Sequence, residues 1–112
     1  MKLFIQRSAE QDILSQVDWY AAQGLPDIAQ RFSLAAMAAI EALVATPQAG
    51  APRTCANPQL TGLRTWPIAG FDAFRVYYLV RPELLTVVRI LHGKQDTGGV
   101  LQSQPVDDPS KH

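Results

Sequence analysis

The chain has 112 residues, less than one typical domain of about 150 residues, so we expect a single hydrophobic core. Hydrophobic residues make up 47% of it and charged residues 18%, a composition that is typical of a globular protein and argues against disorder. Lys and Arg number 10, as do Asp and Glu, so the formal charge is zero. Zero net charge excludes a uniformly basic nucleic-acid-binding protein.

The charge is nevertheless unevenly distributed. Residues 1–52 carry three basic and five acidic residues, residues 53–94 carry six basic and two acidic ones, and the remainder is again acidic. The middle of the chain is therefore basic. Such asymmetry is compatible with an ordinary solvated face, and equally with a surface that meets an anionic partner.

Cys55 is the only cysteine, which excludes an intramolecular disulfide and a four-cysteine zinc site. A reducing compartment is the expected environment. The apolar run after Lys2 is too short for the core of a signal peptide, and the run Leu34 to Ile40 is too short to span a membrane. We therefore expect a soluble, cytoplasmic protein.

The first half of the chain predicts a strand followed by two helices. Residues 2–6 alternate and are rich in strand-forming residues. Residues 8–11 have the form of a capping box, and apolar positions then recur every three or four residues through Ala21, which predicts an amphipathic helix of about four turns. Gly24 suits a left-handed C′ position and Pro26 a new helix start, so residues 24–26 predict the corner of a helical hairpin.

The second helix is expected to run from about Pro26 to Ala45, ahead of Pro47. Its predicted core positions recur at helical spacing: Ala29, Phe32, Ala36, Ile40 (or Ala39) and Leu43. Leu34, Met37 and Val44 cannot all join the same core, so the helix is apolar on more than one face. Single exposed apolar residues explain this pattern, and so does a surface that a second chain covers.

The second half predicts an antiparallel meander. Residues 47–62 are rich in Pro and Gly and indicate an irregular connector. Three strand-like runs follow, at residues 63–68, 73–80 and 84–92, separated by short turns. The order of elements predicts an α+β domain, one strand, a helical hairpin and a three-strand meander, with the hairpin on one sheet face. Residues 97–112 are polar and predict a loosely held tail.

Strand alternation predicts which meander residues share a face. Tight turns would place Arg75 opposite Trp66 and Ile90, and Tyr77 opposite Arg64 and Val88. One face then collects basic and aromatic residues: Arg64, Trp66, Arg75, Tyr77 and His92. The other face collects Leu63, Phe74, Val76, Tyr78, Val80, Leu85, Val87 and Leu91. Arg89, Val88 and Ile90 fall on the wrong faces in this register, so either a β-bulge shifts it or both faces are covered.

The basic and aromatic residues could bind an anion or form an ordinary solvated face. Arginine side chains match the geometry of phosphate or carboxylate, and His92 could transfer a proton near neutral pH. Stacking of Arg64 and Arg75 on the aromatic rings explains the same residues without a ligand. The sequence contains no phosphate-loop or dinucleotide motif, and its two histidines do not predict a metal site. Cys55 has only His92 as a possible partner for nucleophilic chemistry.

The sequence resembles the RelE/ParE superfamily of toxins from bacterial type II toxin-antitoxin systems. The resemblance spans about residues 3–96 and rests on five segments: 7–13 (RSAEQDI), 47–50 (PQAG), 63–68 (LRTWPI), 73–78 (AFRVYY) and 88–96 (VRILHGKQD). The superfamily fold has the same order of elements as the one predicted above. The resemblance implies a toxin domain at 1–96, with residues 97–112 as a polar C-terminal tail, and no cofactor or metal.

The resemblance implies one of two activities. ParE-like members inhibit DNA gyrase through protein contacts, whereas RelE-like members are ribosome-dependent messenger-RNA endonucleases. Arg75 matches a sheet arginine of the nucleases, but Gln95 stands where they commonly carry arginine, and their C-terminal tyrosine has no counterpart here. The ending of residues 92–96 (HGKQD) is closer to the ParE-like pattern. The ParE-like interpretation is therefore favoured.

The ParE-like interpretation predicts two binding surfaces on a protein that forms a hetero-oligomer with a ParD-like cognate antitoxin. The residues expected to contact gyrase are Arg64, Trp66, Arg75, Tyr77, His92 and Lys94. The residues expected to contact the antitoxin are Trp19, Tyr20, Leu34, Met37 and Val44. The nuclease alternative, whose partners would be the ribosome and messenger RNA, would use Arg64, Arg75, Arg89 and His92 as catalytic residues.

Overall fold

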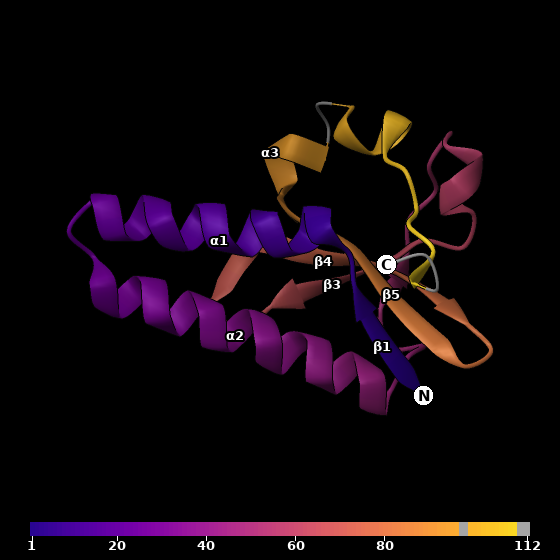
Figure 1. The fold of residues 1–112 in the computed structure, drawn as a ribbon, viewed down its shortest axis with the longest axis horizontal. Coiled ribbons are helices and arrows are strands. Elements are labelled where there is room, and N and C mark those ends of the chain that lie inside the picture. The colour runs from indigo at the N-terminus through magenta and orange to yellow at the C-terminus, as the bar shows by residue number, and fades with distance from the viewer. Residues whose placement is uncertain (97–98, 110–112) are drawn as a thin grey trace.

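The predicted order of strand, helical hairpin and meander is confirmed in a computed structural model, which describes residues 1–96 and 99–109 (Figure 1). The first strand and the hairpin are β1 (Lys2–Ile5), α1 (Arg7–Ala22) and α2 (Pro26–Ala45). The meander consists of β3 (Arg64–Ile68), β4 (Phe71–Arg81) and β5 (Leu84–His92). The shorter elements are β2 (Ala51–Pro52), α3 (Gly93–Asp96) and the 3₁₀ helices Pro58–Leu60 and Val100–Ser103.

The five strands form one sheet in the order β1-β5-β4-β3-β2. The meander strands pair antiparallel, whereas β1 pairs parallel with β5. The strands that come first and last in the sequence are therefore neighbours in the sheet. The short β2, which lies within the predicted connector, pairs with β3 at the opposite edge. We call the side of the sheet that carries α1 and α2 the helix face, and the other side the second face (Figure 1).

Both helices follow the hydrophobic pattern of the sequence. The buried residues of α2 are Ala29, Phe32, Ala36, Ala39, Ile40 and Leu43, which confirms the predicted stripe. The corner also forms as expected: Gly24 has φ 76°, its N–H donates to the carbonyl of Ala21, and the N–H of Leu25 donates to that of Tyr20. These two bonds satisfy carbonyls at the end of α1 that would otherwise lack partners.

The capping box expected at residues 8–11 is wrong. Helix α1 begins at Arg7, and Gln6 precedes it without a side-chain cap. The Ser8 hydroxyl instead donates to the carbonyl of Val88 at 3.0 Å. A tertiary hydrogen bond has replaced the local one: the Val88 carbonyl, which also accepts from the Gln6 side chain, takes the Ser8 hydroxyl as its shorter donor.

The predicted register of the meander is also wrong, because of a β-bulge. Tyr77 pairs with Arg89 and Tyr78 pairs with Val87, so Val88 has no residue opposite it. This extra residue shifts Arg75 from Ile90 to Leu91. In the first hairpin, Trp66 pairs with Val76 rather than Arg75, because the register shifts between Pro67, which pairs with Arg75, and Ile68, which pairs with Phe71. The bulge was one of the two explanations open for the misplaced residues of β5.

The register divides the sheet residues between two cores. The core on the helix face includes Phe32, Ala36, Ile40, Leu43, Ile68, Val76, Tyr78, Leu85, Val87 and Ile90, with Trp66 and Phe74 packed against it. The second face has its own cluster: Leu60, Leu63, Tyr77, Leu79, Val88, Leu91 and Leu101. Both faces are therefore covered, and the single face of basic and aromatic residues that alternation predicted does not exist.

The expectation of a loosely held tail is wrong for residues 99–109, which we call the C-terminal segment. Leu101 is buried in the second cluster, and its carbonyl and that of Gln104 both accept hydrogen bonds of 2.9 Å from the Asn57 side chain. The N–H of Asp107 donates to the Gln6 side chain at 2.8 Å. Polar composition misled the prediction, because side-chain amides bind this segment in addition to its one buried leucine. Residues 97–98 and 110–112 lie outside the described residues.

Candidate functional site

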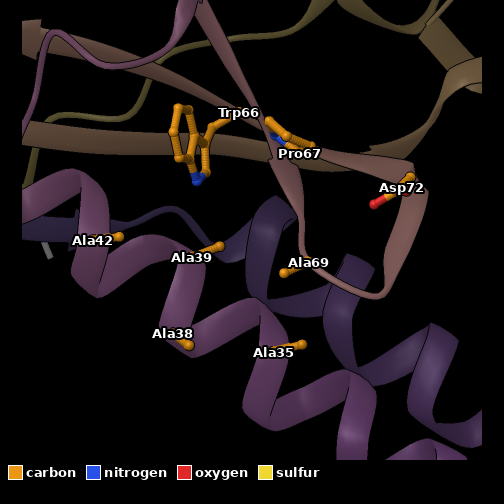
Figure 2. A pocket seen from close by; sticks show the side chains of 8 residues that line it. All are labelled: Ala35, Ala38, Ala39, Ala42, Trp66, Pro67, Ala69 and Asp72. Atoms are coloured by element: carbon orange, nitrogen blue, oxygen red, sulfur yellow. The ribbon is translucent and has the colours of Figure 1, made fainter.

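A hollow of about 420 Å³ lies between α2 and the β3–β4 hairpin (Figure 2). Four alanines of α2, at positions 35, 38, 39 and 42, form one wall, and Trp66 and Pro67 form the opposite one. Ala69 lines it near Ala35, and Asp72 lines it from the β3–β4 hairpin. The four alanines have the spacing of one helix face, so the hollow has a smooth apolar floor with a carboxylate at one end.

A second hollow of about 490 Å³ continues the first toward the hairpin corner. It shares Ala35 and Ala69 with the first and adds Ile28, Arg31, Gly70 and Phe71. We call the two together the α2 groove. Its lining is mostly apolar, with a positive charge at Arg31 and a negative charge at Asp72, which suits a partner segment that is apolar with a few charges.

The residues predicted to contact the antitoxin are unequally exposed. Trp19, Leu34 and Met37 are exposed, with Leu34 at 64%. Val44 is half-buried, and Tyr20 packs inward, with its ring centroid 5.9 Å from that of Phe32. The α2 groove itself was missed, although Ala35, Ala38, Ala39 and Ala42 carry its signal in their i, i+3, i+4, i+7 spacing.

The residues predicted to contact gyrase are not on one face. Trp66 lines the α2 groove, and Arg64 lies on the same face next to Tyr78. Tyr77 is buried in the cluster on the second face, and Arg75 precedes it by two residues on that face. Two irregularities explain this separation, the bulge in β5 and the register shift between Pro67 and Ile68, because each changes which residues of neighbouring strands share a face.

Arg64 is engaged in holding the loop at residues 47–50. Its guanidinium donates to the carbonyl of Gly50 at 2.6 Å and to that of Gln48 at 3.3 Å. The buried Tyr78 hydroxyl donates to Pro47 and accepts from the N–H of Gly50. A side chain at Gly50 would meet the Tyr78 hydroxyl at 2.4 Å, so only glycine fits there. The role of Arg64 in this structure is to stabilise a loop.

Arg89 is engaged in a partly buried ion pair. Its Nε and Nη2 donate to the two carboxylate oxygens of Asp12, each at 2.7 Å, and its Nη1 donates to Gln104. Asp12 also accepts the N–H of Ile90 at 2.9 Å. The guanidinium is thus bound from two sides by α1 and by the C-terminal segment. It has no fork directed to an external phosphate.

His92 and Lys94 lie where β5 leads into α3. The His92 ring stacks edge-to-face on Phe74 at 5.2 Å, and its Nδ1 accepts the N–H of Lys94 at 3.2 Å. Arg75 pairs with Leu91, next to His92 in the chain, but points to the other face. The four residues of the nuclease alternative therefore do not converge on one point.

The described ranges, 1–96 and 99–109, contain neither a Cys55–His92 pair nor a metal-binding cluster. Cys55 packs against the second cluster, whereas His92 stacks on Phe74 of the helix-face core, so the two do not meet. Within those ranges, no group of three or more His, Cys, Asp or Glu residues could hold a metal ion.

Burial raises the pKa of the Tyr78 hydroxyl, while its hydrogen bond from Gly50 and the nearby Arg64 act in the opposite direction. The native state therefore retains this proton at a pH where the unfolded chain, with a pKa of 10.0, has lost it. The contribution of Tyr78 to stability is complete below pH 10 and falls as the pH rises toward the native pKa.

We predict that Tyr78→Phe removes this alkaline loss of stability. The variant should be less stable at neutral pH by about 1–3 kcal/mol, because the N–H of Gly50 loses its acceptor. Its unfolding free energy should then fall less steeply than that of the wild type above pH 10, as measured by urea denaturation across a pH series. Tyr20→Phe is the control and should keep the wild-type slope. Parallel curves for Tyr78→Phe and wild type would contradict the prediction.

The fold and the site define a class of protein: a small α+β protein with a mostly apolar groove on a helix and without an assembled catalytic cluster in its described residues. The family model described as the ParE toxin of type II toxin-antitoxin system, parDE, matches residues 3–97. The chain therefore belongs to the ParE toxin family.

A solved structure supports the same fold. A chain described as the chromosomal ParDE TA system from P. aeruginosa matches with a TM-score of 0.67 and 22% identity. The match covers 82% of this chain and 95% of that one. No curated relative matches. The resemblance seen in the sequence is thus confirmed at the level of family and fold, and the ParDE context supports an antitoxin partner.

Proposed function

We propose that this ParE-family toxin inhibits DNA gyrase by protein contact and is held inactive by a cognate antitoxin in the cytoplasm. One observation argues against a nuclease: its four expected catalytic residues, Arg64, Arg75, Arg89 and His92, do not converge on one point. Arg64 holds the 47–50 loop and Arg89 is paired with Asp12, so neither supplies a cation to a scissile phosphate. General acid-base cleavage needs its groups around one reacting atom.

The gyrase contact is expected where β5 leads into α3. His92 and Lys94 lie there, and Arg75 lies close by on the second face. We leave Trp66 and Tyr77 out of this contact surface, because Trp66 lines the α2 groove and Tyr77 is buried. The proposed contact surface therefore has a smaller set of residues than the sequence indicated.

Expression of the toxin without its antitoxin tests this function. We expect filamentous cells with an induced DNA-damage response, while messenger RNAs remain intact, because stalled gyrase leaves DNA breaks and not cleaved transcripts. The measurements are a DNA-damage reporter and RNA sequencing of transcript ends in the same culture. Rapid cleavage of messages at ribosomes would favour the nuclease, and normal growth would favour an inert binding module.

We infer that the antitoxin lies in the α2 groove and extends over Leu34 and Met37. Helix α2 is unusually apolar: among the described helices, it is the one whose length and composition would suffice to cross a membrane. Its core-facing residues account for only part of that apolarity, and the groove lining accounts for another part. An amphipathic partner helix or an added strand would cover this surface.

Ala38→Arg should weaken antitoxin binding at least about tenfold, because a long charged side chain would fill the groove and lose its hydration when covered. Ala38 is exposed, so the fold should be unaffected. Affinity for the cognate antitoxin is measured by calorimetry. Ala22→Arg, at an exposed position of α1, is the matched control and should bind as the wild type does. Equal affinity for all three proteins would place the antitoxin elsewhere.

A further inference from the structure

Trp66 carries a hydrogen-bond donor that no described residue satisfies. Its ring is half-buried against the helix-face core and forms one wall of the α2 groove. Figure 2 shows Nε1 on the edge of the ring nearest to α2. Within residues 1–96 and 99–109 this nitrogen has no hydrogen-bond partner. Every fully buried side-chain nitrogen or oxygen in those ranges does have one, so Nε1 lies within reach of solvent and of a partner molecule.

The opposite wall of the groove offers this donor no acceptor. The side chains of α2 that line the hollow with Trp66 are all alanine methyl groups, which cannot accept a hydrogen bond. The main-chain carbonyls of α2 accept instead from N–H groups four residues further along the helix. A segment that fills the groove displaces water from the indole. Because an unpaired buried donor costs free energy, the segment that binds best supplies an acceptor.

The groove also presents two charges of opposite sign. Arg31 of α2 and Asp72 of β4 both line it, and both are exposed. Neither side chain forms a hydrogen bond or an ion pair with another residue of the described part of the chain. The other charged residues of α2, Asp27 and Glu41, are exposed and do not line the groove. An occupant with a carboxylate near Arg31 and a cation near Asp72 matches both charges, whereas the reverse orientation brings like charges together.

We propose that the antitoxin enters the α2 groove as an apolar segment that places a hydrogen-bond acceptor on Nε1 of Trp66, an acidic residue near Arg31 and a basic residue near Asp72. This inference rests on the proposed function, which locates the antitoxin in the groove, and adds the chemistry that the segment must carry. A carboxylate, a side-chain amide or a free main-chain carbonyl provides a suitable acceptor. The alanine wall accepts many apolar side chains, so the three polar groups determine which antitoxin fits and in which orientation.

Two measurements on the full-length toxin and its full-length cognate antitoxin test the hydrogen bond. The chain has two tryptophans, so a proton–nitrogen NMR correlation spectrum contains two indole N–H signals, which Trp66→Phe assigns. In the complex we expect the Trp66 indole proton to move downfield and to exchange more slowly with solvent. Calorimetry should show that Trp66→Phe, which keeps an aromatic ring, binds about tenfold more weakly than the wild type. Trp19→Phe is the matched control, because Trp19 is exposed on α1 outside the groove, and it should bind as the wild type does.

A pair of substitutions that leaves the net charge unchanged tests the orientation. Arg31→Gln with Asp72→Asn should weaken binding by about threefold at low salt, and the difference should shrink at high salt. Lys2→Gln with Glu83→Gln removes the same two charges from exposed positions outside the groove and should leave the affinity unchanged. Equal affinities for the two double variants would overturn the predicted orientation.

The remaining outcomes separate this inference from the proposed function. If Ala38→Arg weakens binding while Trp66→Phe does not and the Trp66 indole signal stays in place, the antitoxin lies in the groove without using the indole, and the inference is overturned. An equal loss in Trp66→Phe and Trp19→Phe would overturn it as well. If Ala38→Arg also binds normally, the antitoxin site of the proposed function is itself wrong. Circular dichroism checks that each variant folds, and the indole signal of the wild type decides the matter even where Trp66→Phe does not.

Discussion

The ion pair between Arg89 and Asp12 joins three parts of the protein that are remote in sequence. It connects β5 to α1 directly and, through Gln104, connects both to the C-terminal segment. The two side chains are only 18% and 13% exposed, so each charge depends on the other for its solvation. The pair lies beside the bulge at Val88, where the displaced carbonyl accepts from Ser8 and from Gln6. The bulge, the ion pair and the amide side chains thus form one polar network, in which each member supplies the hydrogen-bond partner of another.

This network determines how the sheet is used. Because the bulge moves the register by one residue, Val88 and Leu91 lie on the second face, where Leu101 covers them, while Ile90 lies on the helix face. Arg89, which could otherwise bind an anion, is bound instead by Asp12 and Gln104. What remains on the surface is an apolar groove on α2 and a small group of polar residues after β5. These are features of a protein that works through contacts with partners.

The helices and the order of the elements could be predicted because they depend on local patterns. The residues of α2 repeat at helical spacing, and Gly24 and Pro26 define the corner without any tertiary information. The parallel pairing of β1 with β5 and the strand β2 depend on long-range contacts that no local pattern contains. A bulge is also invisible locally, since Val88 and Arg89 have no feature that reveals which residue is unpaired. The prediction that the basic and aromatic residues share one face was wrong for this reason: shifts in the pairing of neighbouring strands placed Arg64 and Trp66 on the face opposite Arg75 and Tyr77. The C-terminal segment was misjudged because amides from Gln6 and Asn57, far away in sequence, hold it.

A double-mutant cycle on Asp12 and Arg89 tests most directly whether the ion pair organises the fold. The unfolding free energies of the wild type, Asp12→Ala, Arg89→Ala and the double variant give the coupling between the two side chains. For a bidentate pair this far removed from water, the account predicts a coupling of about 2–3 kcal/mol. A coupling below about 0.5 kcal/mol, as in an exposed surface pair, would show that Arg89 is not held for structural reasons. It would also return Arg89 to the set of residues available for an anionic substrate.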